Sequence, residues 1–259
     1  MKYEEIIYSI SDSSMNDRET PLVSIVLPTY NERENIETLV PKIIDVFKEN
    51  DLRGELIIVD DNSPDGTGEF ADILAKKIPN ITVIHRKVKS GLGSAYKAGF
   101  KKASGKIVME MDADHSHNPR DIPRLVEAVL KGYDLAIGSR YIVGGKIVGW
   151  GIDRKMVSKG ANTLAALILQ INRFAKDVTS GYRAYRAKVL NKIDMSAVKS
   201  SGYAFQLDML VETLRNGFKV KEVPITFIDR RIGESKLGLG DILGFFLTVL
   251  RVRFKKLRL

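Results

Sequence analysis

The chain has 259 residues, 44% of them hydrophobic, so it is long enough to bury the core of one full domain. It contains no cysteine, which excludes disulfides, thiolate metal sites and thiol nucleophiles. The net charge of +9 favours anionic partners such as nucleic acid, anionic lipid headgroups or phosphorylated substrates.

Residues 1–20 are polar and acidic and lack the basic-then-apolar order of a signal peptide, so we expect a mobile N-terminal tail there. No apolar run reaches the roughly 18 to 20 residues that a transmembrane helix needs.

From residue 22 onward, short β-branched runs alternate with segments that carry apolar residues at helical spacing. The pattern predicts strands at 22–28, 55–61, 81–86, 106–112 and 134–141, and helices at 34–47, 67–78, 92–103 and 119–132. Such alternation is typical of a mostly parallel sheet covered by helices on both faces.

After residue 141 the alternation of strands and helices is less regular. A glycine-rich stretch at 144–151 precedes a long predicted helix at 153–171. A strand or loop leading into a helix follows at 177–190, and a further helix at 202–217 closes with Gly217 at its C-cap. The segment 219–231 alternates like a strand, and Pro224 favours an edge position for it.

Three polar loops follow predicted strands: "PTYNE" at 28–32, "DDNSPDGT" at 60–67 and "DADHSH" at 112–117. In open parallel sheets, ligands bind beyond the carboxyl ends of the strands. We therefore expect the three loops to form one site.

The loop at 112–117 crowds two carboxylates and two histidines together. Repulsion between like charges favours a bound cation or nearby positive groups. There are three functional alternatives: a divalent-metal clamp on an anionic substrate, a catalytic acid/base pair, or a zinc site through His115 and His117. A solvated acidic turn ahead of a helix is the purely structural one.

Other polar residues also have structural interpretations. Asn31 can cap the next helix, and Asp60 can cap the turn that "SPDG" predicts. The glycines at 91–93 lack full phosphate-loop spacing, which favours close helix packing. The segment 202–217 is read mainly as a buried helix, on which Gln206 or Asp208 could face a substrate.

Several motifs together carry a resemblance to a known family. "PTYNERENI", "DDNSPDGT", "GLGSAYKAGF", "MDADHSHNP", "GSRY", "TSGYRAYR", "GYAFQLDML" and "VPITFIDRRIGESKLG" occur in the order found in dolichyl-phosphate mannose synthases. The match runs from about residue 22 to about residue 240, and the later motifs narrow it to polyprenyl-phosphate sugar synthases. The resemblance implies a GT-A glycosyltransferase fold over residues 21–239. It also implies inverting transfer of mannose from GDP-mannose to dolichyl or another polyprenyl phosphate.

The resemblance also implies site residues. The loop after the fourth strand is the metal motif, in which Asp112, Asp114 and Ser116 would hold Mg²⁺ or Mn²⁺ against the donor diphosphate; relatives often carry glutamine at the third position. The implied donor-binding residues are Pro28, Tyr30, Glu32, Val59, Asp61, Asp112, Ala113, Asp114, Arg140, Arg230 and Lys236.

For the acceptor phosphate, the resemblance implies Arg140, Arg154 and Ser158. Guanidinium groups grip a phosphate through planar, bidentate hydrogen bonds that lysine does not match. Asp114, Arg140 and Arg154 are the expected catalytic residues. A phosphate acceptor is already nucleophilic, so it needs positioning and charge balance more than a general base.

Residues 240–259 are apolar first and then basic, which predicts an amphipathic helix at a membrane interface; a helix packed on its own domain is the alternative. We expect a peripheral protein at the cytoplasmic face of a membrane, with small membrane-protein partners as a further expectation. Two other functions compete: glucose transfer from UDP-glucose to the same lipid phosphate, and nucleic-acid binding. Basic residues are not interleaved with aromatic ones in any recognisable nucleic-acid module, so no nucleic-acid partner is expected.

Overall fold

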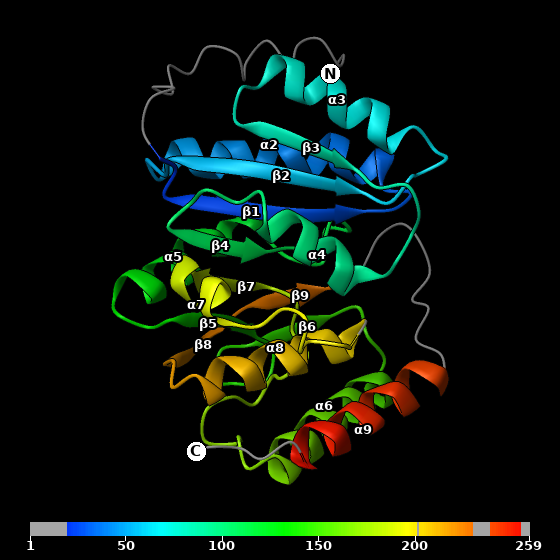
Figure 1. Cartoon of the computed structure of the whole chain (residues 1–259), viewed down its shortest axis with the longest axis vertical. Helices are drawn as coiled ribbons and strands as arrows, with labels where there is room; N and C mark the ends of the chain where they lie inside the picture. Colours follow the sequence, from blue (N-terminus) through cyan, green and yellow to red (C-terminus); the bar gives the residue numbers. More distant parts are fainter. Residues whose placement is uncertain (1–19, 201, 230–238, 255–259) are drawn as a thin grey trace.

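The computed structural model describes residues 20–200, 202–229 and 239–254 (Figure 1). The predicted N-terminal tail therefore lies outside the described residues, apart from residue 20. Arg230 and Lys236 lie outside them too.

A seven-stranded sheet with the order β3-β2-β1-β4-β7-β5-β8 forms the centre of the molecule (Figure 1). Its strands are β1 (Val23–Thr29), β2 (Gly54–Asp60), β3 (Ile81–His85), β4 (Ile107–Glu110), β5 (Leu135–Ser139), β7 (Arg183–Arg186) and β8 (Val220–Pro224). The helices are α2 (Arg33–Glu49), α3 (Thr67–Lys77), α4 (Leu92–Phe100), η1 (Pro119–Asp121), α5 (Ile122–Leu130), α6 (Ile152–Ile168), α7 (Ala187–Lys192), α8 (Tyr203–Arg215) and α9 (Leu239–Phe254).

Alternating side chains of the central strands divide the core into two layers. In β1, Ile25 and Leu27 pack with α2, α3 and α5, whereas Val26 between them packs with α4 and α8 on the other face. Because both faces are covered, the central parallel strands β1 and β4 are mostly hydrophobic, as is typical of parallel strands. The predicted mostly parallel sheet with helices on both faces is confirmed.

One strand runs against the others. β7 is antiparallel to both β4 and β5 and separates them, while β5 pairs with β8 in parallel. The sequence left 177–190 undecided between strand and loop, and it gave no sign of this insertion. Pro224 ends β8, one of the two edge strands of this sheet. The predicted edge position is confirmed, since a proline has no N–H to donate to a further strand.

The predicted strand at 219–231 is instead split in two. After β8 the chain turns into β9 (Thr226–Ile228), which pairs in parallel with β6 (Lys146–Val148) from the glycine-rich stretch. This small sheet carries Asp229 and Trp150 to the carboxyl edge of the main sheet.

Two local predictions have different outcomes. Asn31 is not the N-cap of α2: that position is Glu32, and Asn31 adopts a left-handed φ of 59° in the preceding turn. The C-cap of α8 is Asn216, and Gly217 is the residue after it, with a φ of 75° that glycine accepts at little cost.

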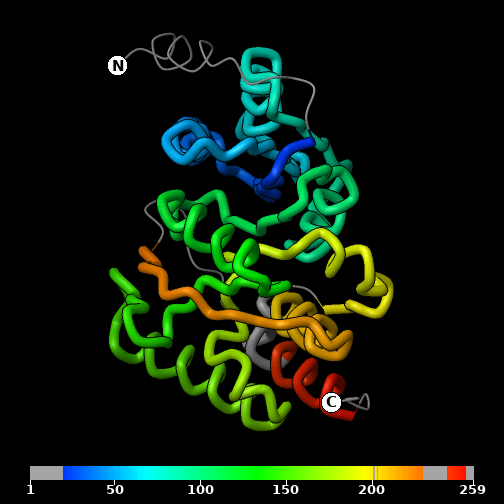
Figure 2. The backbone as a smooth tube through the Cα atoms, turned by 90° about the vertical axis from the view of Figure 1, so that its left-hand side faces the viewer, coloured from blue at the N-terminus to red at the C-terminus, as the bar shows by residue number. Residues whose placement is uncertain are grey.

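The C-terminal helix α9 lies against α8 and beside α6 (Figures 1 and 2). Phe245, Val249 and Val252 are buried in the contact. Arg251 donates to Asp208 Oδ2 at 2.6 Å, which ties α9 to α8. Asp208 is thus a structural partner of α9. None of the helices in the described ranges is both long and apolar enough to cross a bilayer.

Glycine packing gives a first prediction. A Cβ at Gly93 would lie 2.6 Å from the Phe205 ring, whereas a Cβ at Gly160 on α6 would meet nothing within 4 Å. We expect Gly93→Ala to lower the free energy of unfolding by about 1–3 kcal/mol through overpacking, and Gly160→Ala to raise it by about 0.5–1 kcal/mol. Urea unfolding of both variants measures this. Equal effects would contradict the packing interpretation of residues 91–93.

Candidate functional site

The three polar loops meet at one edge of the sheet, as expected from parallel strands. They follow β1, β2 and β4, whose residues pair in register. The first two loops are joined by hydrogen bonds from the backbone at the start of α2. The Glu32 N–H donates to Thr67 Oγ1 at 3.0 Å, and the Arg33 N–H donates to Asp65 Oδ2 at 3.2 Å. Side chains of the second loop thus satisfy backbone donors at the start of α2.

The predicted donor residues differ in what they can contact. Pro28, Tyr30 and Glu32 are partly exposed, and Lys89 lies 3.7 Å from the centre of the Tyr30 ring. Val59 is completely buried in the core, so its side chain does not line the site; Ala113 is 4% exposed.

The first two aspartates of the second loop, Asp60 and Asp61, have different partners. Asp60 caps the turn, because its carboxylate accepts hydrogen bonds from the Ser63 N–H and from Thr29 Oγ1. Asp61 pairs with Arg86 at 2.9 Å. Burial raises the pKa of Asp61, and the Arg86 charge opposes that rise. Arg86 is a site residue that the sequence did not single out.

The loop after β4 is rigidly built. The buried Tyr96 hydroxyl donates to Asp112 Oδ1 at 3.1 Å, and the Ser116 N–H donates to Asp114 Oδ1 at 3.0 Å. The Nδ1 of His117 accepts the Asp112 N–H at 3.1 Å, and its ring stacks on Tyr182 with centroids 4.6 Å apart. Burial lowers the pKa of His117, so its imidazole is neutral at pH 7.

This arrangement fits a hard divalent cation better than zinc. Nδ1 of His117 is engaged by the loop backbone, and His115 Nε2 bonds to Thr38 Oγ1 at 2.8 Å. In the described part of the chain, no group of three or more His, Cys, Asp or Glu side chains is placed to hold a metal. Two carboxylates remain beside the buried Ser116 Oγ, which lacks a hydrogen-bond partner there. A site of this kind suits Mg²⁺ or Mn²⁺, which complete their shells with water and substrate phosphates.

A third carboxyl group lies under this loop. Glu110, the last residue of β4, is fully buried, and burial raises its pKa to about 8 despite the nearby charge of Arg183. It therefore carries a proton at neutral pH, so only Asp112 and Asp114 contribute negative charge to the loop.

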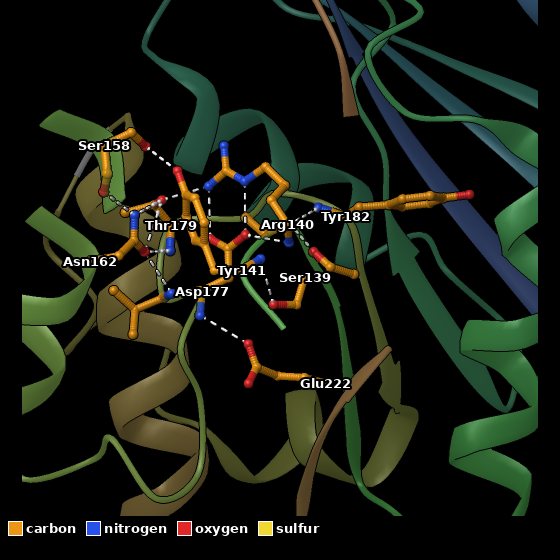
Figure 3. A network of polar contacts seen from close by, with 12 residues as sticks. Ser139, Arg140, Tyr141, Ser158, Asn162, Asp177, Thr179, Tyr182 and Glu222 are labelled. Atoms are coloured by element: carbon orange, nitrogen blue, oxygen red, sulfur yellow. Dashed lines mark hydrogen bonds and ion pairs between the residues drawn. The ribbon is translucent and has the colours of Figure 1, made fainter. Parts of the chain in front are cut away.

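Arg140 follows β5 and lies in a buried polar network (Figure 3). Its Nε and Nη2 each donate to Asp177 at 2.7 Å, and Nη2 also donates to Thr179 Oγ1 at 2.9 Å. Burial alone would raise the pKa of Asp177, but the charge and hydrogen bonds of Arg140 outweigh it and lower that pKa. Asn162 of α6 joins the network through Thr179 at 3.0 Å.

Arg154 lies on the first turns of α6. It stacks over Trp150, 4.0 Å from the ring centre, and pairs with Asp229 at 3.2 Å. Trp150 Nε1 donates to the same carboxylate at 3.1 Å. Stacking and pairing fix the plane of the guanidinium, which a lysine ammonium could not reproduce.

The three predicted acceptor residues line one cavity. It measures about 580 Å³ and lies between α6 and α9. Arg140, Arg154 and Ser158 share it with apolar side chains that include Trp150, Val157, Leu164, Phe245 and Phe246. Asp153, Asn162 and Thr179 complete the polar part of the lining. Guanidinium groups beside apolar side chains match a ligand with an anionic head and a hydrocarbon chain.

Comparison with known proteins decides the family. The model of glycosyl transferase family 2 matches residues 24–194. The chain belongs to glycosyl transferase family 2. Undecaprenyl-phosphate mannosyltransferase from Micrococcus luteus is 46% identical over 225 residues, which cover 86% of this chain and 89% of the relative. Polyprenol monophosphomannose synthase from Mycolicibacterium smegmatis is 46% identical over 229 residues, covering 87% and 84%.

Solved structures of another enzyme share the fold. Glucosyl-3-phosphoglycerate synthase from Mycobacterium tuberculosis, in complex with phosphoglyceric acid, superposes with a TM-score of 0.65. The two sequences are 20% identical, and the match covers 98% of this chain and 85% of that one. The same enzyme has been solved with Mn²⁺, UDP and glucosyl-3-phosphoglycerate, at a TM-score of 0.63.

The buried pair gives a prediction. Asp177→Asn leaves Arg140 buried without its counter-charge, so we expect the free energy of unfolding to fall by about 3 kcal/mol at pH 7. Asp177 has a lowered folded pKa, so its contribution is complete above the ordinary carboxyl pKa of about 3.9 and is lost as pH falls below it. Urea unfolding at about pH 7 and about pH 3 should show the gap between wild type and variant shrinking at the lower pH.

The control for this measurement is Asp72→Asn, which removes one partner of an exposed pair with His85. Its effect should be below about 1 kcal/mol. A gap for Asp177→Asn that stays constant or grows on acidification would contradict the assignment.

Proposed function

We propose that this protein transfers mannose from GDP-mannose to a polyprenyl phosphate, with inversion at the anomeric carbon, giving polyprenyl-phosphate mannose. The observation that carries the proposal is the one cavity that Arg140, Arg154 and Ser158 line together with many apolar side chains. The names of the two relatives at 46% identity support the same lipid acceptor and sugar.

The acceptor phosphate supplies the nucleophile. One of its oxygens attacks the anomeric carbon of mannose from the face opposite the leaving group, the new C–O bond forms as the bond to the diphosphate breaks, and GDP departs. The phosphate oxygen has no proton to lose, so a general base is unnecessary. Arg154, aligned by Trp150 and Asp229, would orient the phosphate, and Arg140 would supply fixed positive charge beside it.

On the donor side, Pro28, Tyr30, Glu32 and Asp61 would surround the nucleotide. Asp112 and Asp114, with Ser116 beside them, would hold Mg²⁺ or Mn²⁺, which when bound neutralises charge that accumulates on the departing diphosphate. Arg230 and Lys236, proposed as further diphosphate contacts, lie outside the described residues.

The lipid acceptor places the reaction at a membrane. We propose that the protein acts peripherally, at the cytoplasmic face, and small membrane-protein partners are compatible with this. The site gives no support to nucleic-acid binding, since its loops are acidic. Glucose transfer from UDP-glucose is the second candidate, because glucosyl-3-phosphoglycerate synthase, which has the same fold, has been solved with UDP-glucose.

A donor panel tests the proposal. Purified protein is incubated with polyprenyl phosphate, Mg²⁺ or Mn²⁺, and radiolabelled GDP-mannose, UDP-glucose or UDP-N-acetylglucosamine, and label is extracted into organic solvent. Label from GDP-mannose is expected. Lipid-extractable label from UDP-glucose alone would replace mannose by glucose, and label from none would reject the transferase assignment.

The metal loop gives another prediction. Asp114→Asn keeps an oxygen to accept the Ser116 N–H but removes the charge, so we expect turnover to fall by at least about a hundredfold with folding retained. Asp112→Asn should also reduce turnover. Initial rates at saturating metal measure the turnover of both variants, and thermal unfolding checks that they fold. Asp72→Asn is the control. Near-normal turnover in either loop variant would exclude the metal clamp.

A separate prediction distinguishes acceptor from donor. Arg154→Lys keeps the charge but loses the planar fork, so the rate at low polyprenyl phosphate should fall about ten- to a hundredfold while GDP-mannose affinity changes little. Initial rates and calorimetric titration with GDP-mannose and metal give the two quantities. Arg173→Lys, an exposed arginine beyond α6, is the matched control. Equal loss of donor affinity would move Arg154 to the diphosphate site.

A further inference from the structure

The hydroxyl of Ser158 in the acceptor cavity is held by a residue that does not line the cavity. Ser158 lies on α6, and its Oγ accepts a hydrogen bond of 2.7 Å from the hydroxyl of Tyr141 (Figure 3). Tyr141 is half-buried and directly follows Arg140 in the segment after β5. Because Tyr141 is not part of the cavity lining, it would act on a bound ligand through Ser158.

The direction of this hydrogen bond leaves the Ser158 proton available. The phenol donates and Ser158 Oγ accepts. Burial raises the pKa of Tyr141, so the phenol keeps its proton at neutral pH. In the described part of the chain, the Ser158 hydroxyl makes no other hydrogen bond, and a serine that accepts one still has its own proton to donate. A phosphate oxygen in the cavity, which can only accept, would take that proton.

A competing acceptor for this proton lies within α6 itself. Serine and threonine inside helices often donate to the carbonyl four residues earlier. Thr163 on the same helix does so, with 2.9 Å between its Oγ1 and the Lys159 carbonyl oxygen. The equivalent acceptor for Ser158 is the Arg154 carbonyl, and a hydrogen bond to it would turn the proton along the helix. The Tyr141 hydroxyl opposes this turn, because it stabilises the orientation in which Ser158 Oγ faces the phenol.

Holding α6 in place does not depend on this contact. Asn162, one turn after Ser158, accepts the backbone N–H groups of Val178 and Thr179 at 2.8 and 3.1 Å. Its amide donates to Thr179 Oγ1 at 3.0 Å and to the Ser158 carbonyl at 2.8 Å. Asn162 therefore anchors this turn of the helix, and the contribution left to Tyr141 is the orientation of one hydroxyl group.

We propose that Tyr141 is a positioning residue for the acceptor: by donating to Ser158 Oγ, its hydroxyl directs the Ser158 proton into the cavity, toward the acceptor phosphate. This rests on the proposed function, which supplies that phosphate. The phosphate oxygen would end a chain of two hydrogen bonds that begins at the phenol, and hydrogen bonds in a chain polarise and strengthen one another. Ser158 would thus add an aimed neutral donor beside the charge of Arg154.

A double-mutant cycle tests the proposal. A short, water-soluble prenyl phosphate is titrated calorimetrically into wild type, Tyr141→Phe, Ser158→Ala and the double variant. We expect Ser158→Ala to weaken binding about tenfold and Tyr141→Phe about three- to tenfold, because a hydrogen bond to a charged group is lost or misdirected. In the Ser158→Ala background, Tyr141→Phe should cause no further loss, since the phenol acts through the serine. Losses that multiply in the double variant would overturn the proposal, as would wild-type affinity in Tyr141→Phe.

Two controls separate positioning from a general disturbance. Tyr133→Phe removes a phenol hydroxyl just before β5, at the opposite end of the strand from Tyr141, and should bind prenyl phosphate as wild type does. Titration with GDP-mannose and metal should give the same affinity in every variant, and thermal unfolding checks that each one folds. If Tyr141→Phe lost as much donor affinity as prenyl-phosphate affinity, the positioning role would be overturned.

Activity distinguishes this inference from the proposed function. Transfer from GDP-mannose should be slowed in Tyr141→Phe at low acceptor and restored at saturating acceptor, because the acceptor KM rises while kcat changes little. Transfer by wild type with losses that multiply in the cycle would overturn the role of Tyr141 and keep the proposed function. Prenyl-phosphate binding with the expected cycle, but no transfer to any acceptor, would reject the proposed function and leave the role of Tyr141 standing. Neither binding nor transfer by wild type would overturn both.

Discussion

The buried ion pair between Arg140 and Asp177 is the constraint on which the acceptor side of the site depends. A guanidinium only 8% exposed beside an apolar cavity requires a counter-charge, and Asp177 supplies one that is fully buried. The pair also joins elements far apart in sequence: the Asp177 N–H donates to Glu222 on β8 at 2.9 Å, and Thr179 links the pair to α6. Because Nε and Nη2 are committed to this pair, we expect Arg140 to stay in place when substrates bind and not to move between them.

The loop that follows β4, on the proposed donor side of the site, balances its charge in a different way. Three carboxyl groups occupy β4 and the loop after it, but burial keeps Glu110 protonated and His117 is neutral. The loop thus presents two negative charges on a backbone braced by Tyr96 and His117. A divalent cation would neutralise that charge, while Arg140 and Arg154 would face the anionic acceptor. Between the two sides, the neutral His117 ring packs edge-on against Phe227, and the Arg140 guanidinium lies 5.4 Å from the centre of the Phe227 ring.

Local periodicity was enough to predict β1 to β5, the helices between them and the edge at which the polar loops meet. It left β7 undecided between strand and loop, because "RAYR" contains two arginines and a strand pattern does not show how a buried arginine is satisfied. Arg183 donates to the carbonyls of Val178, Ser180 and Gln206. Asp177 and Asp229 were missed for the same reason. Their arginine partners are 37 and 75 residues away, and no local pattern reports such pairings. A buried arginine requires an acidic partner, but the sequence does not identify which aspartate supplies it.

Helix α6 connects the two arginines of the cavity through its own periodicity. Arg154 and Ser158 are one turn apart and line the cavity, and Asn162, one turn further, bonds to Thr179 and so to the Arg140 network. An α-helix is stiff over this length, so any displacement of Arg154 would also move Asn162 and, through Thr179, disturb the Arg140 network. One helix therefore keeps the two arginines of the cavity in register with each other.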